Sequence, residues 1–182
     1  MALTRLNTNA YGSTVNLASN VTGTLATGNG GTGATSFTSG KVGQVIQATT
    51  SSAVNVASTS VADTGLTVNI TPTATTSKVL VQVNQNILTD IDTNLGNAKL
   101  QLRRGDTTVI DFTTNIARVE ANGSSAVKFG NLTTFSHLDS PSTTSQITYK
   151  TQGAISSTSN NGTARFQNSS VPSIITVMEI LA

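Results

Sequence analysis

From Lys41 onward the chain alternates between apolar and polar residues. Within residues 78–87, Val79, Val81 and Val83 fall on one face of an extended strand, and amide side chains fall on or near the other. This two-residue period predicts half-buried β-strands. No segment shows the 3.6-residue period of an amphipathic helix. The pattern predicts strands at residues 42–48, 54–57, 66–70, 78–87, 98–103, 107–112, 116–121, 127–137, 147–152, 165–166 and 174–181.

Glycine, asparagine and serine residues separate these runs, which recur about every 8–12 residues. Many short strands joined by such turns are typical of β-sandwiches and jelly rolls. We therefore predict an all-β protein in which residues 41–182 form an antiparallel, jelly-roll-like β-sandwich.

Residues 1–40 carry a different pattern, in which single apolar residues are spaced through a Thr, Asn, Gly and Ser background. The segment has too many glycines for a helix and too few apolar residues for a core of its own. Terminal segments of this composition are ordered only when a partner holds them. We expect an extended arm at residues 1–40 that binds such a partner.

The composition agrees with strands and turns, since Ser and Thr together number 54 of the 182 residues. Charged residues make up only 10% of the chain, and the net charge is +2. Short, uncharged side chains suit a surface that packs against copies of itself. The ten basic residues are scattered from Arg5 to Arg165, so we expect no nucleic-acid binding.

The chain contains no cysteine, which excludes disulfides and thiolate chemistry. No apolar run approaches the roughly 18 residues that a membrane-spanning helix needs, and the first residues lack the apolar region of a signal peptide. We expect a protein that folds in a reducing cytoplasm and does not insert into a membrane.

The segment Leu25–Ser36 contains Asn-Gly-Gly-Thr-Gly-Ala-Thr, and it resembles a segment found in many bacteriophage tail-fibre proteins. Several downstream segments are similar to the C-terminal domains of small virion proteins from phages of aquatic bacteria. These segments are Ser77–Val81, Arg103–Asp106, His137–Thr144 and Ile174–Ile180. These segments are spread from residue 25 to residue 180, so the resemblance extends along most of the length of the chain.

This resemblance implies a homotrimeric virion protein, assembled in the bacterial host cytoplasm, with an N-terminal anchoring arm and a C-terminal β-knob. The arm would dock on phage capsid or tail proteins through Leu3, Arg5, Leu6, Tyr11, Val15 and Leu17. As a tail or head fibre, the knob would attach to a host-surface glycan. The alternatives are a capsid decoration (cement) protein that clamps neighbouring capsid subunits, and a small carbohydrate-active enzyme.

Two polar motifs have both a functional and a structural interpretation. Arg104, Gly105 and Asp106 match a tripeptide that integrins read, but a hairpin turn with an exposed tip accounts for them, since glycine supplies a positive φ. A second motif, Asp90, Asp92 and Asn94, resembles the start of a calcium loop. It lacks the glycine and glutamate spacing of an EF-hand, so a polar loop is favoured over a cation site.

Catalytic groups are scarce in this sequence. His137 is the single histidine, and although Asp139, Ser136 and Ser140 are close to it in sequence, adjacent strand residues point to opposite faces. The spacing of the eight acids neither favours nor excludes a glycosidase pair. These acids are Asp63, Asp90, Asp92, Asp106, Asp111, Glu120, Asp139 and Glu179. We expect no enzymatic activity and no cofactor.

Overall fold

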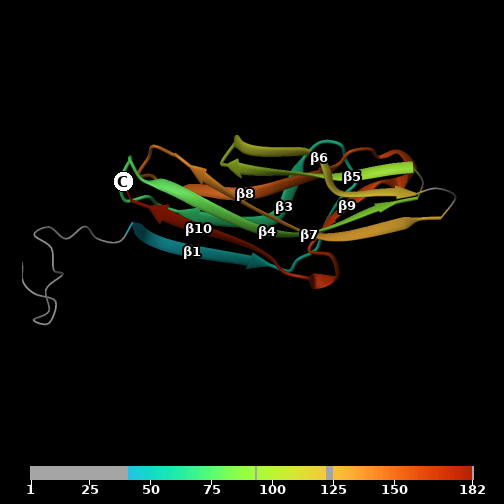
Figure 1. Cartoon of the computed structure of the whole chain (residues 1–182), viewed down its shortest axis with the longest axis horizontal. Helices are drawn as coiled ribbons and strands as arrows, with labels where there is room; N and C mark the ends of the chain where they lie inside the picture. Colours follow the sequence, from blue (N-terminus) through green and yellow to red (C-terminus); the bar gives the residue numbers. More distant parts are fainter. Residues whose placement is uncertain (1–40, 93, 122–124, 182) are drawn as a thin grey trace, which may run out of the picture. The chain divides into compact units, whose positions relative to one another are not determined.

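The computed structural model describes residues 41–92, 94–121 and 125–181, and in this part of the chain the prediction of an all-β fold is confirmed. Ten strands form two antiparallel sheets (Figure 1). The six residues expected to anchor the arm, and the whole of residues 1–40, lie outside the described residues.

The strands follow the predicted segments in order. They are β1 (Val42–Thr50), β2 (Val54–Val56), β3 (Ala62–Ile70), β4 (Lys78–Ile91), β5 (Asn94–Arg104), β6 (Thr107–Ala121), β7 (Val127–Asp139), β8 (Ile147–Ile155), β9 (Thr163–Phe166) and β10 (Ser173–Ile180). Two single 3-10 turns, Ser159–Asn161 and Asn168–Ser170, flank β9. The described residues contain no helix with the length and apolar character needed to cross a membrane.

The strand order is that of a jelly roll. Without the short strands β2 and β9, one sheet runs β1-β10-β4-β7 and the other runs β3-β8-β5-β6. We call them sheet A and sheet B. Consecutive long strands change sheet at every step except the β5–β6 hairpin, and β10 returns to lie between β1 and β4. Two interlocked Greek keys give this order.

Eight of the ten strands are longer than the sequence pattern predicts, and β6 joins two predicted strands. Residues 107–112 and 116–121, which alternate separately, are one strand of 15 residues, β6. The pairing of β5 with β6 shifts register between Gly96 and Ala98 and between Ala98 and Leu100. Such shifts change which side chains face inward. The alternation is therefore broken within a continuous strand.

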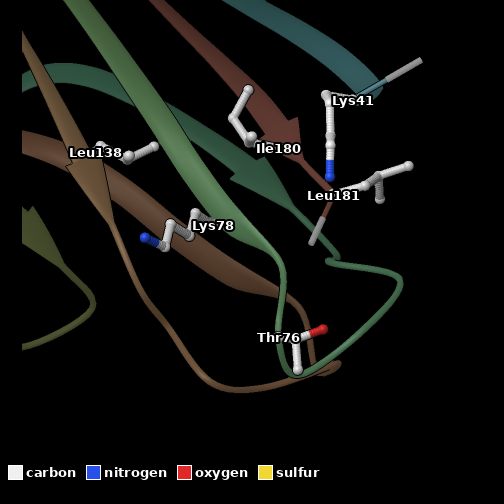
Figure 2. Close-up of a pocket in the computed structure, with 6 residues that line it drawn as sticks. All are labelled: Lys41, Thr76, Lys78, Leu138, Ile180 and Leu181. Atoms are coloured by element: carbon white, nitrogen blue, oxygen red, sulfur yellow. The ribbon is translucent and has the colours of Figure 1, made fainter. Parts of the chain in front are cut away.

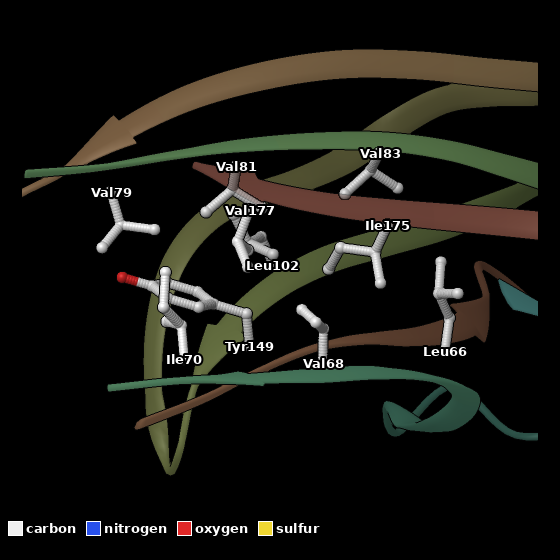
Figure 3. Close-up of a cluster of buried hydrophobic side chains, with 10 residues drawn as sticks. All are labelled: Leu66, Val68, Ile70, Val79, Val81, Val83, Leu102, Tyr149, Ile175 and Val177. Atoms are coloured by element: carbon white, nitrogen blue, oxygen red, sulfur yellow. The ribbon is translucent and has the colours of Figure 1, made fainter. Parts of the chain in front are cut away.

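The core fills the space between the two sheets in two apolar clusters. The first cluster contains valines of β4 and β10 on one side, and residues of β3 together with Tyr149 of β8 on the other (Figure 3). The second cluster surrounds Phe166 and Ile87. The valines at alternate positions of β4 are fully buried, as their spacing predicts.

A belt of buried polar side chains lies between the two clusters. Gln85 occupies an inward position of β4, between Val83 of the first cluster and Ile87 of the second. Its Oε1 accepts a hydrogen bond from the hydroxyl of Thr151 at 2.8 Å, and its Nε2 donates to Ser173 Oγ at 3.0 Å. The belt is uncharged and hydrogen-bonded, so its burial costs little.

A buried carboxylate ties one end of the sandwich together. Glu179, fully buried near the end of β10, accepts hydrogen bonds from the backbone N–H and hydroxyl of Thr73 at 2.6 and 2.7 Å. Its other oxygen accepts from Gln44 Nε2 at 2.7 Å. Burial raises the pKa of Glu179, but the hydrogen bonds from Gln44 and Thr73 outweigh this effect and lower the pKa to about 2.

Candidate interaction face

The outer side of sheet A presents a nearly uncharged surface, which we call the neutral face. It is built by alternation, because inward residues of each strand fill the core and the residues between them point outward. Its members are Val45, Gln47, Thr49, Leu80, Gln82, Asn84, Asn86, Leu132, Thr134, Ser136, Leu138, Ile174, Thr176 and Met178.

Part of the neutral face is apolar. The strand register aligns Val45 of β1 with Met178 of β10, Met178 with Leu80 of β4, and Leu80 with Leu138 of β7. These four residues form a continuous row across the sheet, which we call the apolar band. Val45 is 57% exposed and Leu138 is 47% exposed. Single exposed apolar residues are ordinary on a protein surface, whereas this row makes a contiguous apolar surface across four strands.

The next row along the strands consists of amide and hydroxyl side chains. It runs Gln47, Thr176, Gln82 and Ser136, and Gln47 Nε2 donates to Thr176 Oγ1 at 3.0 Å. Around Gln82 and Ser136 the surface is hollowed by about 410 Å³. Each of these side chains is neutral and short, so this part of the neutral face offers hydrogen-bonding groups without charge.

Charged residues border the neutral face at its two ends. Between Lys78 and Asp90 of β4, and in the described strands paired with that stretch, the outward positions carry no acid or base except Arg165. At the far end, Asp90 Oδ2 lies 2.7 Å from Arg165 and 3.4 Å from Lys128. The charged side chains therefore lie at the two ends of an uncharged centre.

An open hollow of about 420 Å³ lies at the other end, beside the apolar band. Figure 2 shows Leu138 of β7 and Ile180 of β10 on the two sides of β4, with Lys78 near them. Lys41 and Leu181 complete much of its lining. The floor of the hollow is aliphatic and its edge carries the ammonium groups of Lys41 and Lys78. As on the rest of the neutral face, the charges lie at the end and the centre is uncharged.

The outer side of sheet B has the opposite character. Asp63 of β3 lies 3.0 Å from Lys150 Nζ and accepts a hydrogen bond from Gln152 at 2.7 Å. On the neighbouring strands Gln101 donates to Asp111 at 2.8 Å. Burial raises the pKa of Asp63, but the hydrogen bonds from Gln152 and Lys150 outweigh this and lower it. These cross-strand pairs give sheet B a charged outer surface whose polar groups bond to one another.

The hairpin tip is formed by fewer residues than the sequence suggests. Gly105 has a φ of +55°, as the first position of a two-residue hairpin turn requires, and both Gly105 and Asp106 are exposed. Arg104 instead directs its guanidinium to Asp139, with 2.6 Å between Nη1 and Oδ2. Tyr149 donates its hydroxyl to the same oxygen at 2.6 Å. Arg104 is thus a structural residue that ties the turn to β7 and β8.

The three residues of the candidate cation site have other partners or lie outside the described side chains. Asp90 is paired with two cationic side chains, and Asp92 accepts a hydrogen bond from Asn161 Nδ2 at 2.6 Å. The side chain of Asn94 is not described. Within residues 41–92, 94–121 and 125–181, no three acids, histidines or cysteines gather where a metal ion would fit.

The histidine and the acids do not assemble into a triad in the described part of the chain. His137 and Asp139 both sit at inward positions of β7, but Asp139 is bound by Arg104 and Tyr149. Burial and the neighbouring Asp139 carboxylate raise the pKa of Tyr149. A general acid needs a raised carboxyl pKa, whereas the carboxyl pKa values of Asp63 and Glu179 are lowered.

Reasoning from the sequence expected an uncharged surface but did not place it on the outer side of sheet A. A signal was present, because β1, β4 and β10 carry no charged residue at the outward positions of their central parts. What the sequence did not contain was the order of these strands in the sheet. Because these strands are neighbours in sheet A, their uncharged outward positions form one continuous surface.

No protein-family model and no curated protein matches the chain. Among solved structures, it is similar to a chain of infectious bursal disease virus, Gt strain, at 18% identity and a TM-score of 0.33, covering 78% of this chain and 39% of that chain. It is also similar to a chain of the T13 particle of that virus, at 16% identity and a TM-score of 0.38, covering 78% of this chain and 36% of that chain. A chain of T=1 particles derived from the same virus is similar at 18% identity and a TM-score of 0.35, covering 78% of this chain and 37% of that chain.

The chain spans less than two fifths of the length of these viral chains. With TM-scores below 0.5, the likeness adds nothing to the jelly-roll assignment, which comes from the strand order of the chain itself.

Proposed function

We propose that the protein is a non-enzymatic structural component of a tailed-phage virion, a homotrimer whose N-terminal arm docks on the particle and whose jelly roll projects from it. The observation that carries the proposal is the neutral face, a large uncharged surface on a sandwich whose other outer side is charged. Such a surface serves assembly better than catalysis.

Two further observations support this function. Jelly rolls are the building units of many viral capsid and lectin domains. The segment Leu25–Ser36 resembles one found in phage tail-fibre proteins. Fold alone does not establish function, so the proposal depends on the surface and on these residues together.

The projecting domain would attach to a host-surface glycan through its loops, as in a tail or head fibre. The alternative use is a capsid cement that clamps neighbouring capsid subunits. The two uses differ in copy number, because fibres are present in a few dozen copies or fewer and cement proteins in hundreds.

The test is absolute quantification of the chain by mass spectrometry in purified particles of the phage that encodes it. A few dozen copies or fewer per particle is the expected result for a fibre, and hundreds of copies would assign the cement role. Absence from purified particles would overturn the proposal. Light scattering should give about three times 18.6 kDa for the purified protein.

The non-enzymatic part has a separate test. The purified protein is incubated with host capsule or lipopolysaccharide, and released oligosaccharide is measured. No release is expected. Reproducible release that is abolished when one of the eight acids is changed to its amide would show that the protein is an enzyme.

A further inference from the structure

We propose that neighbouring copies of this chain pack against one another through the neutral face. The inference rests on the proposed self-association and adds to it the surface that is buried. Two steps support it, namely the size of the outer side of sheet A and the chemical match of the neutral face to a copy of itself.

The whole outer side of sheet A, with the neutral face at its centre, has the size of a specific interface. β4 has 14 residues and β7 has 13, and about 3.4 Å per residue gives a length of about 45 Å. Sheet A is four strands wide along this length, first with β1 and β10 and then with β2 and β9, and a spacing of about 4.8 Å gives about 19 Å. The product is roughly 850 Å² for this whole outer side, against about 800 Å² per partner in a typical specific interface. The neutral face, from Leu80 to Asn86 of β4, takes about half of this length, so the buried surface also includes the charged ends.

The chemistry of the neutral face suits its own copy. Amide and hydroxyl groups both donate and accept hydrogen bonds, so a row such as Gln47, Thr176, Gln82 and Ser136 can pair with an identical row. The apolar band can likewise bury itself against another copy of the band. A surface that must meet its own copy cannot carry like charges at its centre, and here the charges lie at the two ends.

The outer side of sheet B is a poorer candidate for self-association. Its centre carries Asp63, Lys150 and Arg103, and Asp63 and Lys150 already bond across strands within the same chain. Burying this surface would remove charged groups from water without a new partner for each. A partner that recognises charged groups would bind the outer side of sheet B, because the neutral face has no charged groups at its centre.

The test uses the full chain and three lysine variants. Val45→Lys and Leu138→Lys place a charge in the apolar band, at positions that are about half exposed in the single chain and tolerate lysine. Thr67→Lys is the matched control, because Thr67 is exposed on the outer side of sheet B. Sedimentation velocity over about two decades of protein concentration measures association, and far-UV circular dichroism checks folding.

We expect the unmodified chain and Thr67→Lys to form the same oligomer, and the two band variants to associate at least about 30-fold more weakly while remaining folded. Equal association in all four proteins would overturn the assignment of the neutral face but not the homotrimer. A folded monomer for the unmodified chain at every concentration would overturn both.

The virion role is read out separately by the copy number in purified particles, so its failure is distinguishable from failure of the interface. If the band variants self-associate normally but no longer enter particles, another virion protein covers the neutral face. That result would also overturn the inference.

Discussion

Replacing Glu179 by glutamine is expected to destabilise the protein strongly at neutral pH and hardly at all in acid. The side chain is fully buried and its two oxygens accept three hydrogen bonds, at 2.6, 2.7 and 2.7 Å, from Thr73 and Gln44. Glutamine has nearly the same size, so the change removes charge with little change in packing. One carboxylate oxygen becomes an NH₂ group that faces donors.

The magnitude follows from these contacts. A hydrogen bond to a charged group contributes about 1.5–3 kcal/mol, and an amide retains part of the set. We therefore expect Glu179→Gln to lower the free energy of unfolding by about 3 kcal/mol at pH 7. A protein of this size shifts its Tm by about 2–4 °C per kcal/mol, so the Tm should fall by about 10 °C.

The pH dependence identifies the charge as the cause. The pKa of Glu179 is lowered from 4.5 to about 2 in the folded protein, so its stabilising contribution is complete above pH 4.5. As the pH falls from about 4.5 to about 2, the folded carboxylate is protonated and this contribution is lost. The difference in Tm between the two proteins should narrow over this range. All other acids titrate in both proteins and cancel.

Thermal unfolding followed by far-UV circular dichroism is the appropriate assay, since the chain has no tryptophan. Glu120→Gln is the control, because the Glu120 side chain is 59% exposed and its partner Arg118 lies 3.7 Å away. Its effect should stay within about 0.5 kcal/mol. If Glu179→Gln lowers the Tm by the same amount at pH 7 and at about pH 2, the electrostatic reasoning is refuted and a change in packing is the cause.

Two further substitutions test the core by the same assay. Gly153→Ala should cost about 2 kcal/mol, because a Cβ at this position would overlap the ring of Phe166, whereas Gly130→Ala has open space and should change stability by less than about 0.5 kcal/mol. Thr151→Val should cost about 2 kcal/mol, because it leaves the buried Oε1 of Gln85 without its donor; an unchanged Tm would show that the polar belt contributes nothing net.

The sequence predicted the strands well because each strand has one buried side. In β4 the valines at 79, 81 and 83 are buried as their spacing requires. Gln85 continues the inward side of the same strand, yet polarity alone would assign it to the surface. Its burial depends on Thr151 and Ser173, which lie more than 60 residues away in the chain, and no local pattern reports such partners.

The hairpin at Gly105 shows the same division between local and distant information. A positive φ at this glycine follows from the turn itself and was predicted. The ion pair between Arg104 and Asp139 was not predicted, because it depends on β7 crossing to the other sheet and ending beside the turn. The local sequence therefore identified the turn, whereas the strand topology determines which of its side chains are exposed and which are held by other strands.

Folding and self-association are coupled in a chain whose neutral face is buried only between copies. Association that favours the folded state adds about 2.7 kcal/mol when the concentration is 100 times the dissociation constant, which is close to the effect expected for Glu179→Gln. Glu179 points into the core and not toward the neutral face. Dilution should therefore lower the Tm of both proteins in parallel and leave the difference between their Tm values unchanged.

A Tm difference that changes on dilution would mean that the Glu179 end of the sandwich is coupled to the neutral face. Strand β1 would connect them, since Gln44 binds Glu179 and the adjacent Val45 lies in the apolar band.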